Sequence, residues 1–319
     1  MEVPASTSRN QRNKYLSYIL GVIVLFLLIT YLIKNKDLLT SLKNIGWQPL
    51  LWIVLLDIMT FVISGGLDQS MIGRFDSRVS FWDCYMLGYA NNFLNKILPT
   101  IGGGAAFRAV YLKKIYQLSY PQFISTIAGL YVISFLITSF IGMFCLVMIF
   151  VTRQVFGLTI FLAFMGIFLF CLGTIAFSPK IPESQNRLVR FVGSIFDGWH
   201  VLKKDPKLIL IYAFFSVALL TLSTLQAYFS YQALGVQTNM ISMVFLATLG
   251  IILAFLNFTP DGIGIKEGVY VFSSELVRIP DGILVLGSLV LRAISLCTTF
   301  VIGGICYLIL LRRLSALKG

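Results

Sequence analysis

Charged side chains are scarce in this sequence. Of its 319 residues only 12% are Asp, Glu, Lys or Arg, whereas 58% are hydrophobic. A soluble domain typically carries about 25% charged residues, and the mean hydropathy of +0.88 points the same way. There are too few polar side chains to cover a water-exposed surface. The composition therefore excludes a soluble enzyme, a disordered chain and a collagen-like chain.

Metal ligands and nucleotide-binding motifs are also missing. The sequence has one histidine, His200, and five cysteines without a CxxC pair. The cysteines are scattered and lie mostly in apolar runs, which is typical of small buried residues. A GxxxxGK[ST] loop and a GxSxG serine motif are both absent. We therefore expect no metal, no cofactor and no ATP-driven or serine-hydrolase chemistry.

Long runs without charge are the main positive feature. Residues 15–33, 115–152, 154–179 and 208–260 contain no Asp, Glu, Lys or Arg. Each run is long enough for at least one spanning helix of about 20 residues. A β-barrel would instead show weak alternating segments of about 10 residues. The sequence predicts an all-α, polytopic membrane bundle with about six to eight spanning helices, including helices over about 48–67 and 282–311.

The organisation of the chain follows from these runs. We expect a cytoplasmic tail over residues 1–14, a transmembrane domain over 15–312 and a second cytoplasmic tail over 313–319. The domain divides into halves at about 34–177 and 178–312. The second half begins with a polar stretch, about 178–207, that is typical of an interfacial amphipathic helix.

The charges are mostly positive, with 25 Lys and Arg against 13 Asp and Glu. In a membrane protein such an excess gathers on the cytoplasmic side, near anionic lipids. We therefore expect a multi-pass protein of the cell (inner, cytoplasmic) membrane with a cytoplasmic N-terminus, although the basic residues in 34–43 favour the opposite orientation. No basic stretch interleaved with aromatic residues indicates a nucleic-acid partner.

Two segments break their apolar surroundings in the same way. Residues 91–112 read NNFLNKILPTIGGGAAFRAVYL, and residues 251–272 read IILAFLNFTPDGIGIKEGVYVF. Aligning Pro99 with Pro260 gives an offset of 161 residues. Proline and glycine end a helix, and the exposed backbone survives at membrane depth only beside protein or a water-filled cavity. The pattern predicts two re-entrant regions and an internal repeat, which we expect to be inverted. Paired interruptions of this kind favour a transporter substrate site, and two kinked helices without a transport role are the alternative.

Ionisable residues inside the apolar segments form the candidate site. Each charge at mid-bilayer costs at least about 2.5–3.5 kcal/mol unless it is paired or faces water. The predicted set has four cations and two carboxylates, and its positive excess favours an anionic guest such as a phosphate. Snorkelling of the basic side chains and interhelical hydrogen bonds of the asparagines are the structural alternatives. The predicted substrate-binding residues are Asp57, Asn92, Asn95, Lys96, Pro99, Gly102, Gly103, Gly104, Arg108, Pro260, Gly262, Gly264, Lys266, Glu267 and Arg292.

These motifs carry a resemblance to a known family. The run Asn95-x3-Pro99-x2-Gly102-Gly103-Gly104-x3-Arg108, the run Pro260-x-Gly262-x-Gly264-x2-Glu267, and Arg292 with Gly303 and Gly304 resemble the lysylphosphatidylglycerol synthase transmembrane family. The resemblance implies a helix bundle with re-entrant segments. It also implies the flipping of aminoacylated phosphatidylglycerol, the role assigned to this domain in multiple-peptide-resistance factors. Those factors carry a soluble aminoacyl-transferase domain that we do not expect here, so the synthase activity is not implied.

The favoured function is a lipid flippase that is not an enzyme. It would move an anionic or aminoacylated phospholipid, or a lipid-linked head group, between leaflets by alternating access. A polyprenyl-phosphate-dependent glycosyltransferase and a non-transporting assembly partner of a lipid-modifying enzyme are the alternatives. The expected partners are the lipid itself, a second copy of the chain, and a separate lipid-modifying enzyme.

Overall fold

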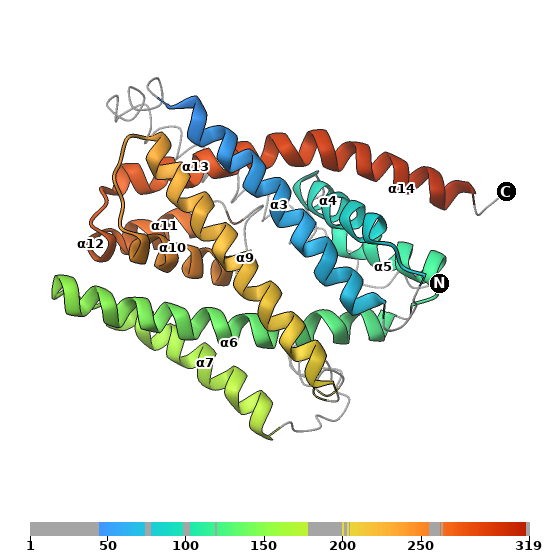
Figure 1. Ribbon diagram of the computed structural model, residues 1–319, viewed down its shortest axis with the longest axis horizontal. Coiled ribbons are helices and arrows are strands. Elements are labelled where there is room, and N and C mark those ends of the chain that lie inside the picture. Colours follow the sequence, from blue (N-terminus) through green and yellow to red (C-terminus); the bar gives the residue numbers. More distant parts are fainter. Residues whose placement is uncertain are drawn as a thin grey trace, which may run out of the picture.

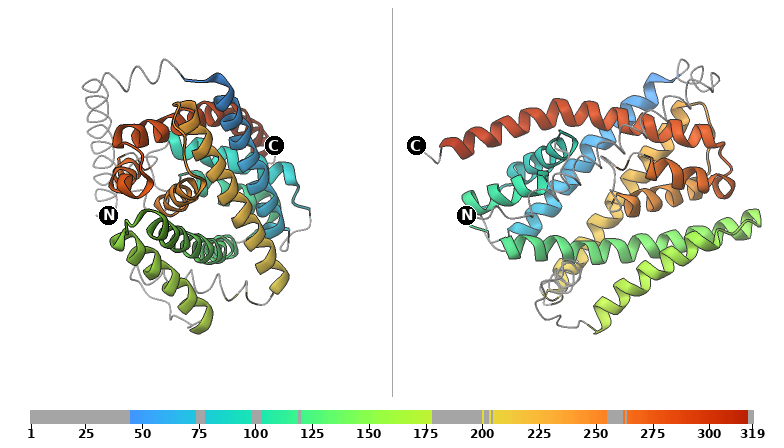
Figure 2. Two further views of the ribbon diagram at one scale, coloured as in Figure 1. Left: turned by 60° about the vertical axis from the view of Figure 1, so that its left-hand side comes forward. Right: turned by 180° about the vertical axis from the view of Figure 1, so that it is seen from behind.

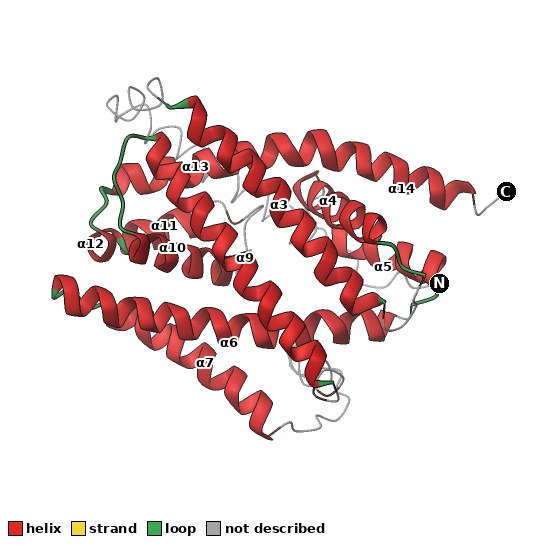
Figure 3. Ribbon diagram, viewed as in Figure 1, coloured by secondary structure: helices red, strands yellow, loops and turns green. Residues whose placement is uncertain are grey.

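The computed structural model describes residues 45–73, 78–97, 103–118, 120–177, 200, 203, 205–254, 262 and 264–316, with only the backbone at 120–128. All regular structure in these ranges is helical, which confirms the all-α prediction (Figure 3). The predicted N-terminal tail and first helix, and almost all of the amphipathic stretch at 178–207, lie outside the described residues.

The helices fall into two sets along the chain. The first set is α3 (Trp47–Ile72), α4 (Phe81–Ile97), α5 (Gly103–Tyr116), α6 (Tyr120–Arg153) and α7 (Leu158–Phe177). The second set is α9 (Pro206–Ala233), α10 (Met240–Leu253), α11 (Ile265–Phe272), α12 (Ser274–Val277), α13 (Asp281–Thr298), the π-helical turn η2 (Thr299–Gly303) and α14 (Gly304–Ala316).

Five helical segments in the described part are long and apolar enough to cross a membrane. They are Trp47–Ile72, Gly129–Arg153, Leu158–Phe177, Pro206–Ala233 and Asp281–Ala316. Large apolar side chains such as Trp47, Leu210 and Phe177 are exposed on their outer faces, which suits contact with lipid. The protein is therefore a multi-pass membrane protein, and the range of six to eight spans stays a prediction.

Local chemistry explains where the second set of helices begins and ends. Asp205 caps α9 by accepting hydrogen bonds from the backbone nitrogens of Lys207 and Leu208 at 2.9 and 3.3 Å, and Pro206 occupies the first turn. Gly235, with φ of +75°, turns the chain after α9. Asn239 then caps α10 through the nitrogen of Ile241. The chain thus turns between α9 and α10, inside the uncharged run 208–260.

Two of the expected helices differ in the structure. Helix α3 continues through Ile72 instead of ending at residue 67, because Ser70 bonds back to the carbonyl of Gly66 at 2.8 Å and Asp68 finds a partner in Arg108. Tertiary pairing here outweighs the polarity of the segment. The last helix, expected to be continuous, changes to π-helical bonding at Thr299–Gly303.

The same order of helices recurs about 160 residues later. Helices α3, α4, α5 and α6 correspond in sequence to α9, α10, α11 and α13. In Figure 1, α3 and α9 run in opposite directions, and so do α6 and the α13–α14 pair on the two sides of the molecule. An inverted repeat requires these opposite helix directions. The inverted repeat itself stays a prediction.

Helices of the first set pack against helices of the second set. Helix α4 of the first set packs against η2 and α14 of the second, and α10 of the second set packs against α6 of the first. Helices α3 and α9, one from each set, pack along each other (Figures 1 and 2). The two sets of helices therefore pack into one bundle and do not form separate units.

Candidate functional site

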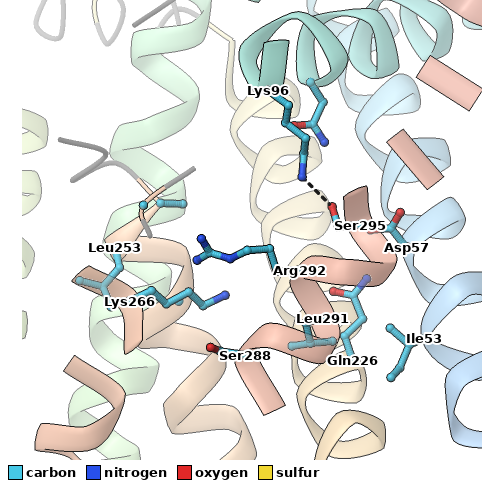
Figure 4. A pocket seen from close by; sticks show the side chains of 14 residues that line it. Ile53, Asp57, Lys96, Gln226, Leu253, Lys266, Ser288, Leu291, Arg292 and Ser295 are labelled. Atoms are coloured by element: carbon cyan, nitrogen blue, oxygen red, sulfur yellow. Dashed lines mark hydrogen bonds between the residues drawn. The ribbon is translucent and has the colours of Figure 1, made fainter. Parts of the chain in front are cut away.

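A cavity of about 310 Å³ lies where the two sets of helices meet. Its walls come from α3, α4, α9, α10, α11 and α13, together with Gly262 of the second break (Figure 4). The lining residues are Ile53, Asp57, Asn92, Lys96, Gln226, Gly250, Leu253, Ala254, Gly262, Lys266, Ser288, Leu291, Arg292 and Ser295.

Helix α13 supplies the polar wall of this cavity. Ser288, Arg292 and Ser295 follow one another at spacings of four and three residues and all line the cavity. Residues at these spacings share one face of an α-helix. The opposite side of α13 can therefore pack into the bundle while this face stays polar.

Arg292 is held in place by a buried carboxylate. Its Nη2 donates to Glu267 Oε1 at 2.9 Å, and Glu267 is only 3% exposed. Glu267 also accepts hydrogen bonds from Ser288 Oγ at 3.0 Å and from the backbone nitrogen of Gly264 at 2.8 Å. These partners satisfy the carboxylate, which a buried ion pair requires. The other terminal nitrogen, Nη1 of Arg292, is buried and bonds to none of the described residues.

Two lysines complete a cluster of three cations. Lys96 of α4 places its Nζ 3.5 Å from Ser295 Oγ, and Lys266 of α11 places its Nζ 5.5 Å from the centre of the Tyr270 ring. Figure 4 shows both side chains extending into the same space as Arg292 from separate helices. Three like charges around one cavity repel one another, so an anion between them would be stabilised.

One carboxylate lines the cavity directly. Asp57 of α3 is 9% exposed and accepts a hydrogen bond from Thr298 Oγ1 at 2.5 Å. Beside it, Asn92 donates to Thr299 Oγ1 at 3.3 Å. Both hydroxyls lie at the junction of α13 and the π-helical turn, and π-helical turns often mark functional positions.

The structure brings many of the predicted residues together. Asp57, Asn92, Lys96, Gly262, Lys266 and Arg292 line the cavity, and Glu267 stands directly behind Arg292. Gly264 turns the chain into α11 with φ of +86°. Pro99, Gly102 and Pro260 lie outside the described residues.

The structure does not bring the N-terminal part of α5 to the cavity. Arg108 pairs instead with Asp68 of α3 at 2.6 Å, with both side chains largely buried. Asn95 accepts a hydrogen bond from the backbone nitrogen of Gly104 at 2.9 Å, and Gly103 is the first residue of α5. In this structure these residues hold α5 against α3 and α4.

Some residues that line the cavity are not among the substrate-binding residues predicted from the sequence. Ser288 and Ser295 could have been found from their spacing to Arg292, which places all three on one helical face. Gln226 could have been noticed as a large polar residue within a long uncharged run. Gly250 could not have been predicted from the sequence, because what it contributes is the space beside Lys266 and the Tyr270 hydroxyl.

Metal binding has no support in the described part of the chain. No three His, Cys, Asp or Glu side chains there lie close enough together to hold an ion. The chemistry that this cavity offers is electrostatic binding with hydroxyl and amide hydrogen bonds.

The comparison with known proteins agrees with this architecture. Residues 18–303 match the family described as the lysylphosphatidylglycerol synthase TM region. The chain belongs to this family. Two curated relatives bear the name UPF0104 membrane protein. The one from Methanocaldococcus jannaschii is 23% identical, covering 94% of this chain and 96% of the relative. The one from Methanothermobacter thermautotrophicus is 20% identical, covering 92% of each. The family match thus spans the whole cavity and both helix sets up to the start of α14.

Proposed function

We propose that this protein moves the head group of an anionic or aminoacylated phospholipid, or of a lipid-linked compound, across the cell membrane. The observation that carries the proposal is the convergence of Lys96, Lys266 and Arg292 on one cavity inside a bundle of apolar helices. Membership of the lysylphosphatidylglycerol synthase transmembrane family supports a lipid substrate.

The charges of the cavity favour a phosphate group. In the described part of the chain, the lining residues together with Glu267 place three cations against two carboxylates, which is one positive charge in excess. Arg292 keeps one terminal nitrogen for a ligand while Glu267 fixes the other. Arginine and lysine donors of this kind bind phosphate oxygens through charge-assisted hydrogen bonds.

The size of the cavity favours a head group over a whole lipid. A water molecule takes about 30 Å³ of liquid volume, so about 310 Å³ holds on the order of ten waters. A phosphate with a glycerol or amino-acid group is of that size, whereas acyl chains are much larger. We therefore propose that the head group enters the cavity and the tails stay in the lipid.

Alternating access needs contacts that close each end, and we assign this role to the contacts of two arginines. Arg153 at the end of α6 donates to the carbonyl of Leu276 at 2.5 Å and to Ser242 Oγ at 2.9 Å. Arg313 near the end of α14 donates to Asp83 Oδ1 at 2.5 Å. Helices α6 and α14 end on opposite sides of the molecule (Figure 1). We propose that these clamps open in turn.

Leaflet exchange in reconstituted liposomes tests the proposed function. Purified protein is inserted into liposomes that contain labelled anionic, aminoacylated or zwitterionic phospholipids, and the label reaching the other leaflet is measured over time. We expect exchange of anionic or aminoacylated lipid above the rate of protein-free liposomes. Lys266→Met should remove it. Lys207→Met makes the same charge change at an exposed site outside the cavity and should retain it.

The same preparation separates the alternatives. Sugar transfer from a polyprenyl-phosphate donor without lipid exchange would indicate a glycosyltransferase. Exchange equal to that of protein-free liposomes with every lipid, and no sugar transfer, would indicate an assembly partner. Equal exchange by the wild-type protein and Lys266→Met would contradict the proposed binding site.

A further inference from the structure

Asp57 differs from the other buried carboxylates in the described part of the chain. Asp68, Asp83 and Glu267 each pair with an arginine, at 2.6, 2.5 and 2.9 Å respectively. Asp57 is similarly buried, but its hydrogen-bond donor is the neutral hydroxyl of Thr298. It is also the only one of the four that lines the cavity. A carboxylate in such surroundings can change its charge, because no arginine fixes it in the ionised form.

The surroundings of Asp57 can be described helix by helix. Helix α3 packs against α4, α9 and α13. The titratable groups facing Asp57 from α4 are Lys96, whose positive charge acts on it, and Tyr89. Helix α9 faces the cavity with the uncharged Gln226, and α13 contributes Thr298 and the charged Arg292. Lys96 and Arg292 are thus the cations whose field Asp57 shares with a bound ligand.

Protonation of Asp57 changes the balance of charge in the cavity. Among the described residues, three cations face two carboxylates when Asp57 is ionised, and they face the Glu267 carboxylate when Asp57 is neutral. The positive excess rises by one charge on protonation. An anionic head group and a proton therefore favour each other's binding, and this coupling is reciprocal by thermodynamic linkage.

We propose that Asp57 binds a proton that crosses the membrane together with the anionic head group. This inference rests on the proposed function and adds its energy source, the proton gradient. The step balances simply: the Asp57 carboxylate takes a proton from water on the side where the head group enters. It returns to the ionised form when the proton leaves with the head group on the other side. No other co-reactant is required.

The coupling can be measured with a pH-sensitive dye trapped inside the liposomes. Labelled phosphatidylglycerol serves as the anionic probe, and lipid exchange and internal pH are followed together. In the wild-type protein we expect proton movement to accompany net lipid movement. With one proton carried per head group, an imposed pH difference should bias net lipid movement by about tenfold for each pH unit.

Variants isolate the role of Asp57. Asp57→Asn is always neutral, so the exchange that remains should carry no protons and should not respond to the pH difference. Asp57→Glu keeps a titratable carboxyl group and should retain the coupling, which guards against a purely structural effect. Asp281→Asn makes the same chemical change at an exposed position at the start of α13 and should behave as the wild type.

Three outcomes would overturn the proposal. Wild-type exchange without proton movement and without a response to pH would reject the coupling and leave the proposed function intact. Proton-coupled exchange that persists in Asp57→Asn would place the proton elsewhere. Wild-type exchange of no lipid at all would reject the proposed function, and the coupling with it.

Discussion

Arg153 and Arg313 make corresponding contacts at opposite ends of the molecule. Each lies at or near the C-terminal end of a long helix, and each donates to the third residue of a helix in the other set, Ser242 of α10 or Asp83 of α4. Arg313 meets a carboxylate that also accepts a hydrogen bond from Tyr116, whereas Arg153 meets a hydroxyl and a carbonyl. The arginine contacts at the two ends thus differ in chemical strength.

Removing either clamp should change which side of the membrane reaches the cavity. We expect Arg313→Met to favour opening at the α14 end and Arg153→Met to favour opening at the α6 end. Each substitution removes hydrogen bonds that the closed end alone makes. Ser295→Cys in an otherwise cysteine-free protein provides the measurement, because a membrane-impermeant thiol reagent added from one side reports access to the cavity.

The two variants should therefore label faster from opposite sides of the membrane. Arg153→Lys and Arg313→Lys serve as controls that keep the charge. Faster labelling from the same side in both methionine variants would contradict the assignment of the two clamps to separate ends.

Gly104 should be intolerant of any side chain. A Cβ at this position would overlap the backbone carbonyl oxygen of Asn91, so α5 could no longer pack closely on α4. Overpacking typically costs about 1–3 kcal/mol, and we expect Gly104→Ala to reach at least the upper part of that range. Thermal unfolding in detergent measures the change. Gly166→Ala is the matched control, because nothing lies within 4 Å of its added methyl group, and it should unfold at the wild-type temperature or above.

The ion pair of Arg292 and Glu267 should be sensitive to loss of one partner. Arg292→Met leaves Glu267 buried without its cation, and breaking such a pair typically costs about 3–5 kcal/mol. The double variant Arg292→Met/Glu267→Gln removes both charges and should recover much of the lost stability. Thermal unfolding of the two proteins is the measurement. A double variant that is no more stable than Arg292→Met would contradict the pairing.

Lys96 and Asp68 should respond in opposite ways to neutral substitution. Lys96 lines the cavity, so Lys96→Met should reduce lipid exchange with little change in unfolding temperature. Asp68 instead pairs with Arg108 away from the cavity, so Asp68→Asn should lower the unfolding temperature, while the protein that remains folded exchanges lipid. Loss of exchange in folded Asp68→Asn would extend the functional site to α5.

The sequence predicts the fold class well because long apolar runs without charge are a direct signal for membrane helices. The uncharged run 208–260 predicts at least one spanning helix. Helix α9 is long and apolar enough to cross a membrane, and α10 is a shorter apolar helix of 14 residues. The break at Thr299–Gly303 in the last helix was not foreseen, because π-helical bonding there follows from packing. Gly303 lies against Tyr89 and Phe93 of α4, and a contact of this kind cannot be predicted from hydropathy.

The candidate site was predictable only in part, because pairing decides which charges face a cavity. Lys96, Lys266 and Arg108 look alike in the sequence, as cations beside glycine and proline. Arg108 pairs at 2.6 Å with Asp68, which lies in the part of α3 beyond the end expected from the sequence. The position at which α3 ends thus decides that Arg108 pairs within the bundle while the lysines line the cavity. That position depends on tertiary contacts, which the sequence alone does not show.

Blocking the cavity tests the central claim most directly. In the Ser295→Cys protein, reaction with a bulky thiol reagent fills the space between Lys96 and Arg292, and Lys207→Cys carries the same label on the exposed surface as a control. Exchange of labelled phosphatidylglycerol is then measured in liposomes. We predict that labelling at residue 295 reduces exchange to the rate of protein-free liposomes, whereas labelling at residue 207 leaves it unchanged. Full exchange through a protein whose cavity is filled would contradict the account.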